Sequence, residues 1–173
     1  MIGHGNESPS GGTKRLSAAS QFIGFVPWIA FTFIAQRLAE DGVAWAALIA
    51  VGLSVLFIIQ SKITDGPQLL NYYSVVIFGA MAVAGFIGDH DLDRWLYEWG
   101  RPLVGVVLGL IVLLTSFNLP FTEEYARKTT PQEYWDSPVF RRVNLVLSAT
   151  WGLAILVMGI CAVLVTAFDE NPR

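Results

Sequence analysis

The densest group of polar side chains that could carry chemistry lies at residues 89–99. It contains three aspartates at alternate positions and one histidine, which are Asp89, His90, Asp91 and Asp93. This spacing resembles the start of a calcium-binding loop, but Arg94 stands where the turn needs glycine and Gly100 where the loop needs its last carboxylate. We therefore expect the aspartates to cap a short amphipathic helix. A metal site, or an enzyme that acts on lipid headgroups through these aspartates, remains the alternative.

Few other residues could bind a cofactor or take part in catalysis. The only histidines, His4 and His90, lie outside the apolar stretches, which argues against a haem held between helices. The single cysteine, Cys161, cannot form an internal disulfide, and we interpret it as a packing residue. The chain has no phosphate-binding loop, dinucleotide fingerprint, zinc-protease motif or serine-hydrolase elbow. We predict a non-enzymatic protein with no catalytic residue, cofactor or metal.

A second group of functional candidates is basic and aromatic and lies in the longest polar connection, 118–142. Its members are Arg127, Lys128, Trp135, Arg141 and Arg142. Helix-start signals accompany them, since Thr130-Pro131-Gln132-Glu133 is a capping box and Ser137-Pro138 repeats the cap-then-proline order. Basic side chains and tryptophan are typical of the headgroup layer. The connection is therefore predicted to form short interfacial helices that present a lipid or partner surface.

The elements that position these groups are five apolar stretches free of Asp, Glu, Lys and Arg. They cover residues 21–35, 43–59, 69–87, 103–117 and 143–168. Most approach the length of a membrane-spanning helix. The chain of 173 residues is 54% hydrophobic and 14% charged, with a mean hydropathy of +0.53. The prediction is an all-α polytopic membrane protein with five transmembrane helices in one domain, 21–168, between a polar tail, 1–20, and a short tail, 169–173.

The distribution of Lys and Arg predicts the orientation. With five spans, a cytoplasmic N-terminus places seven basic residues inside, namely Lys14, Arg15, Lys62, Arg127, Lys128, Arg141 and Arg142. Four fall outside, namely Arg37, Arg94, Arg101 and Arg173. The positive-inside rule then favours a cytoplasmic N-terminus and an external C-terminus. The partners expected are the lipid bilayer and membrane proteins, or self-association, and no nucleic acid.

Small residues at four-residue spacing predict where helices approach closely in lipid. Such stripes occur at Ala46, Ala50 and Ser54, at Ala80, Ala84 and Gly88, at Gly105 and Gly109, and at Ser148 and Gly152. Such stripes can pack helices within one chain or between two copies of the chain. A single sequence does not distinguish these two cases. Pro27 is expected to kink the first span. Asn71, Tyr72, Tyr73 and Asn144 are candidates for hydrogen bonds between helices.

Several motifs, taken in order over residues 21–160, resemble the intracellular septation protein A family of small bacterial inner-membrane proteins, or an uncharacterised sister group. They are F-I-G-F-V-P-W-I-A-F at 22–31, A-W-A-A-L-I at 44–49, V-V-I-F-G at 75–79, Asp91 with W-G-R-P at 99–102, and Trp135, R-V-N at 142–144 and Trp151. The chain departs from the family at Gly24, where the family has an acidic residue, at the inserted Gly100, and in a longer connection at 120–136.

The resemblance implies a function as well as a fold. It implies a bacterial inner-membrane protein that acts through protein partners in cell-envelope maintenance or division-linked envelope synthesis, with no catalytic residue to carry over. Together with the charge-free spans, it makes a membrane scaffold the leading hypothesis. The alternative is a small transporter or channel that forms oligomers through Gly105 and Gly109.

Overall fold

The computed structural model describes residues 23–38, 42–64 and 69–169, and every element within them is a helix. In chain order these are η1 (Ile23–Phe25), α2 (Val26–Leu38), α3 (Val43–Thr64), α4 (Leu69–Ile87), α5 (His90–Trp95), η3 (Leu96–Gly100), α6 (Arg101–Thr115), α7 (Phe121–Ala126), η4 (Gln132–Tyr134) and α8 (Pro138–Asp169). The tail predicted at 1–20 and residues 170–173 of the second tail lie outside the described residues.

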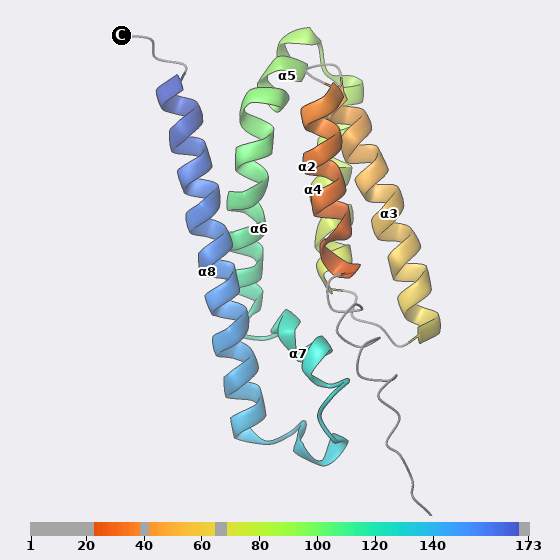
Figure 1. Cartoon of the computed structure of the whole chain (residues 1–173), viewed down its shortest axis with the longest axis vertical. Helices are drawn as coiled ribbons and strands as arrows, with labels where there is room; N and C mark the ends of the chain where they lie inside the picture. The colour runs from red at the N-terminus through yellow and green to blue at the C-terminus, as the bar shows by residue number, and fades with distance from the viewer. Residues whose placement is uncertain (1–22, 39–41, 65–68, 170–173) are drawn as a thin grey trace, which may run out of the picture.

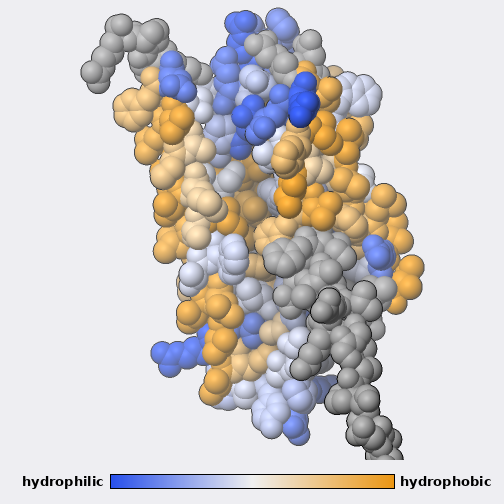
Figure 2. Space-filling view, viewed as in Figure 1, coloured by the Kyte–Doolittle hydropathy of each residue, from blue (hydrophilic) through white to orange (hydrophobic). Residues whose placement is uncertain are grey.

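The helices confirm the all-α membrane class. Four helical stretches are long and apolar enough to cross a membrane, namely Val43–Ile63, Leu69–Ile87, His90–Thr115 and Pro138–Asp169. The first predicted span is the shorter α2, whose 13 residues extend about 20 Å at 1.5 Å per residue. Hydrophobic side chains cover the sides of the bundle and hydrophilic ones gather at its two ends (Figure 2). The described part of the chain is all-helical, with the long apolar helices of an integral membrane protein.

The start of the last helix differs from the prediction for a local chemical reason. It begins at Pro138 rather than 143, because the Ser137 hydroxyl oxygen accepts a hydrogen bond from the Phe140 amide (3.1 Å) and proline suits the first helical turn. Pro27, which was expected to kink the first span, is the second residue of α2 and lies where the 3₁₀ turn η1 passes into that helix. A proline is tolerated in the first turn of an α-helix.

The helices α2, α3 and α4 form one tightly packed group. Ala46, Ala47 and Ala50 of α3 are fully buried, and these small side chains let the neighbouring helices approach closely. Phe78 of α4 is also fully buried, with its ring centroid 4.6 Å from that of Phe31 on α2. A core of small residues against aromatic rings holds this group together.

The helices α6 and α8 form a second close pair through glycines on both sides (Figure 1). A Cβ atom added to Gly109 would lie 2.5 Å from the backbone nitrogen of Leu156, and one on Gly105 would lie 3.1 Å from Cα of Gly159. Across the same contact, a Cβ on Gly152 would lie 2.8 Å from the backbone nitrogen of Leu113. The two backbones are therefore in contact, and the Gly105–Gly109 stripe is used within the chain.

A single π-helical turn, η3, connects α5 to α6 in one continuous helical stretch. Pro102 has no amide hydrogen for the carbonyl one turn earlier, and a wider turn is one way in which a helix accommodates such a loss. Gly100 ends this turn and is buried. The wider turn thus lies inside the helix rather than in a loop.

The two groups meet along α4 and α6 and at both ends of the bundle. Leu108 and Val112 of α6 pack with Ile77 of α4, and the Tyr73 hydroxyl donates to the Thr115 hydroxyl oxygen (2.9 Å). This confirms Tyr73 as an interhelical hydrogen bonder, whereas Asn71 Oδ1 is buried without a partner among the described residues.

Figure 1 places α5 at one end and α7 at the other, and these are called the α5 end and the α7 end below. The helix α2 begins toward the α7 end, and α8 ends at the α5 end (Figure 1).

Candidate functional site

The helix α7 is anchored in the bundle and is not a free surface helix. Phe121 is 5% exposed, and the Thr122 hydroxyl donates to the backbone carbonyl of Asn144 on α8 (2.9 Å). The Thr122 amide also donates to the hydroxyl oxygen of Ser148 (3.2 Å). Short helices were predicted in this connection and are present, but the docking of the first onto α8 was not predicted.

A second anchor joins α7 to α4. Glu124 Oε2 accepts a hydrogen bond from the Leu69 amide (2.9 Å), which is the first amide of α4. Amides in the first helical turn lack intrahelical acceptors, and a carboxylate there also interacts favourably with the helix dipole. Glu124 therefore caps α4 from 55 residues away in sequence.

Tyr125 completes the buried side of α7. Burial, and to a smaller extent the neighbouring Glu124 carboxylate, raise the pKa of Tyr125 from 10.0 to about 12. A Cβ atom on Gly24 of η1 would lie 2.6 Å from the Tyr125 hydroxyl oxygen. The space beside Gly24 is thus taken by the side chain of Tyr125.

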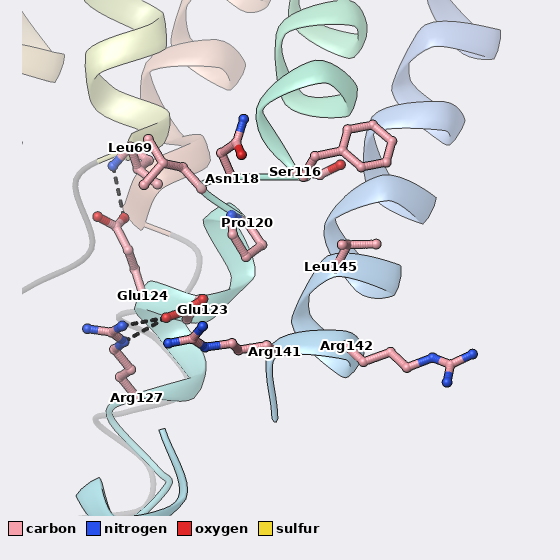
Figure 3. A pocket seen from close by; sticks show the side chains of 12 residues that line it. Leu69, Ser116, Asn118, Pro120, Glu123, Glu124, Arg127, Arg141, Arg142 and Leu145 are labelled. Atoms are coloured by element: carbon pink, nitrogen blue, oxygen red, sulfur yellow. Dashed lines mark hydrogen bonds and ion pairs between the residues drawn. The ribbon is translucent and has the colours of Figure 1, made fainter. Parts of the chain in front are cut away.

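These anchors border an open pocket of about 650 Å³ at the α7 end of the bundle (Figure 3). Its apolar wall contains Leu69, Phe117, Leu119, Pro120 and Leu145. Its polar wall contains Ser116, Asn118, Glu123, Glu124, Arg127, Arg141 and Arg142. Three arginines and two glutamates therefore line one concave site at the edge of the apolar part of the bundle.

The three arginines are held differently. Arg127 Nε donates to Glu123 Oε1 (3.0 Å), and its guanidinium carbon lies 4.9 Å from the centroid of the Trp135 ring. Arg141 Nη2 donates to Asp136 Oδ1 (3.1 Å), but both of these side chains are mostly exposed, so the pair contributes little. Arg142 extends from α8 on the side away from the Glu123–Arg127 pair (Figure 3).

The structure brings part of the predicted lipid or partner surface together. Arg127, Arg141 and Arg142 line the pocket, whereas Lys128 and Trp135 lie outside its wall. Trp135 Nε1 donates to the backbone carbonyl of Thr130 (2.9 Å), so its indole is fixed within the connection. The sequence predicted one basic surface. In the structure, three of its five residues line the pocket and two lie outside it.

The other predicted packing stripe, Ala80, Ala84 and Gly88 on α4, is used less fully. Ala80 is exposed and Ala84 half-buried, and both line an apolar groove of about 360 Å³ between α4 and α6. A Cβ atom on Gly88 would lie 2.5 Å from Cδ2 of Leu92 on α5. Gly88 thus permits the close turn into α5, while the two alanines leave an open groove.

The acidic cluster at the α5 end behaves as a helix cap. Asp89 Oδ1 accepts a hydrogen bond from the Leu92 amide (3.0 Å), as expected for the residue before α5. Asp91 is exposed and Asp93 half-buried. Among residues 23–38, 42–64 and 69–169, no three His, Cys, Asp or Glu side chains come close enough to hold a metal ion.

Sequence reasoning missed Thr122, Glu124 and Gly159. The signal for Gly159 was present, since it continues the Ser148–Gly152 stripe by two turns of α8. Thr122 and Glu124 gave no such signal, because their partners are 22 to 55 residues away.

No family model, no curated protein and no solved structure matches this chain.

Proposed function

We propose that this chain is a non-enzymatic scaffold in a bacterial inner membrane and that it acts in cell-envelope maintenance or division-linked envelope synthesis. The observation that supports the proposal most is the connection 118–142, a folded platform whose inner side is fixed by α4 and α8. The process itself is suggested by the resemblance to the septation protein A family.

The two sides of the platform differ in the way that a docking surface requires. On the inner side, Thr122 and Glu124 are hydrogen-bonded to other helices. On the outer side, Gln132, Glu133 and Tyr134 of η4 are exposed. A rigid polar surface beside the membrane presents contacts to a partner at little entropic cost. The platform is therefore the proposed contact site for a protein partner.

Site-specific photo-crosslinking tests the scaffold proposal. A photoreactive residue at Tyr134 should yield one or a few crosslinked membrane-protein partners in cells, identified by mass spectrometry. The same residue at exposed Asp91, at the α5 end, is the matched control and should not yield those partners. Failure to crosslink any protein from Tyr134, Glu133 and Gln132 would overturn the proposal.

The orientation is part of the proposal, because it decides the compartment in which a partner must lie. The α7 end carries Lys62, Arg127, Lys128, Arg141 and Arg142, and the α5 end carries Arg37, Arg94 and Arg101. By the positive-inside rule the α7 end faces the cytoplasm. Reporter fusions after Asp136 should then behave as cytoplasmic and fusions after Asp93 as external, and the reverse pattern would refute this orientation.

The alternative function is a small oligomeric transporter or channel. The predicted route to oligomers used Gly105 and Gly109, but both face α8 of the same chain. Asp, Glu, Lys and Arg are absent from the apolar stretches 43–59, 69–87, 103–117 and 143–168, which leaves no acidic or basic side chain at mid-membrane for a coupling ion. Purified protein in liposomes should show no uptake driven by a pH gradient, and such uptake would favour the transporter.

A further inference from the structure

The α7-end pocket has the shape and charge of a site for one lipid headgroup, which goes beyond the scaffold proposal and does not depend on it. Arg142 marks the edge of the hydrocarbon layer, because the charge-free part of α8 begins directly after it at Val143. It also borders a second, apolar surface formed by Val139, Val143, Val146 and Leu147. Its side chain therefore stands between lipid-facing residues and the polar pocket.

The pocket lining changes from apolar to charged side chains. Leu69 and Leu145 lie nearer the spanning helices than the charged side chains of the pocket do (Figure 3). Arg141 and Arg142 lie near the start of α8, with their side chains on opposite sides of it (Figure 3). A lipid of the adjacent leaflet would place its acyl chains along the apolar surface and its phosphate beside Arg142.

The charges in the pocket favour an anion. Glu123 is neutralised by its ion pair with Arg127, and Glu124 accepts the capping hydrogen bond from Leu69. Arg127 is paired with Glu123 and Arg141 with Asp136, so Arg142 is the lining arginine without an ion-pair partner among the described residues, and its charge complements one phosphodiester. Because the carboxylates are already engaged within the protein, an ammonium headgroup gains little from them.

We propose that the Arg142 side of this pocket binds the headgroup of one anionic phospholipid, with the phosphate oxygens accepting hydrogen bonds from Arg142. Arginine suits this role because its planar guanidinium can donate two parallel hydrogen bonds to a phosphate.

Native mass spectrometry of the full chain in detergent tests the proposal with phosphatidylglycerol, phosphatidylethanolamine and phosphatidylcholine as probes. Wild type should bind one phosphatidylglycerol at least about tenfold more tightly than either zwitterionic lipid. Arg142→Gln should weaken that binding about tenfold, in line with loss of charge-assisted hydrogen bonds. Arg142→Lys keeps the charge but not the paired donors, and should lose less.

Lys128→Gln is the matched control, because it removes the same charge from the same end of the bundle outside the pocket wall. It should change the affinity less than about twofold. Equal losses for Lys128→Gln and Arg142→Gln would show diffuse attraction to the surface and overturn the proposal. So would equal binding of the three lipids, or glycerol phosphate binding as tightly as the lipid, which would indicate a soluble phosphate ligand. Thermal unfolding of each variant confirms that the bundle is intact.

Discussion

The hydroxyl oxygens of Thr122 and Ser148 lie 2.8 Å apart and join α7 to α8. Ser148 is fully buried, and the same Thr122 hydroxyl donates to the carbonyl of Asn144. Removing a partner from a buried polar group costs about 1–3 kcal/mol. This pair therefore holds the connection 118–142 against the bundle more firmly than its exposed ion pairs do.

Thr122→Val should release α7 while leaving the spans folded, because valine keeps the shape of threonine and removes its hydrogen bonds. We expect trypsin to cleave after Arg127 or Lys128 about fivefold faster or more, since cleavage follows local opening. Thr129→Val is the control, because the Thr129 hydroxyl is exposed and bonds only within its own turn, to the Ala126 carbonyl. Equal cleavage rates in the two variants would contradict an anchoring role for Thr122.

Gly24 and Tyr125 should be coupled in stability. A Cβ atom on Gly24 would lie 2.6 Å from the Tyr125 hydroxyl oxygen, so Gly24→Ala forces this side chain to move. We expect Gly24→Ala to lower the free energy of unfolding by about 1–3 kcal/mol. In the Tyr125→Phe background the obstructing oxygen is gone, and the same substitution should cost clearly less. A double-mutant cycle in detergent measures this coupling, and strict additivity would count against the contact.

The spans were predictable because hydrocarbon excludes charge, a property that each stretch of sequence carries by itself. The predicted range 69–87 coincides with α4. The capping aspartate before α5 and the serine cap of α8 were also predictable, because a cap and its amide lie within three residues.

The pocket could not be predicted in the same way. It depends on α7 turning inward, and α7 is held by Leu69 and Ser148, which lie in two different spans. The sequence showed that Arg127, Arg141 and Arg142 are basic and near the membrane. It did not show that they share one wall with Glu123 and Glu124, because this requires the relative position of α4, α7 and α8.

Stability should depend on pH through Tyr125 at the alkaline end. Its folded pKa of about 12 exceeds the ordinary value of 10.0, mainly because of burial. The neutral form is thus favoured by folding, so the stabilisation is complete below pH 10 and is lost as the pH rises toward 12. A two-unit shift corresponds to an effect on the order of 2 kcal/mol.

Thermal unfolding between pH 9 and 12 tests this expectation. The melting temperature of wild type should fall across the upper part of this range, and Tyr125→Phe should remove part of that fall. The late step in tyrosinate absorbance should disappear in the same variant. Tyr134→Phe, which changes an exposed tyrosine of η4, should leave both signals in place. A late absorbance step that survives Tyr125→Phe would assign it to another tyrosine.

The contact between α6 and α8 should respond to alanine substitutions in a graded order. The Cβ atom of Gly109→Ala would lie 2.5 Å from a backbone nitrogen of α8, and backbone atoms cannot move aside as side chains do. At Gly105 the nearest atom is 3.1 Å away, and at Gly79 nothing lies within 4 Å. Gly109→Ala should therefore destabilise by about 1–3 kcal/mol. Gly105→Ala should cost less, and Gly79→Ala should be neutral or slightly stabilising, because alanine is the better helix former.

Melting temperatures in detergent, with size-exclusion profiles recorded in parallel, check this order. Because the glycine contact lies within one chain, Gly109→Ala should lower the melting temperature without changing the oligomer distribution. Gly79→Ala is the matched control for the effect of a methyl group on an apolar helix. A shift in oligomer distribution with unchanged thermal stability would place the Gly109 contact between copies of the chain instead.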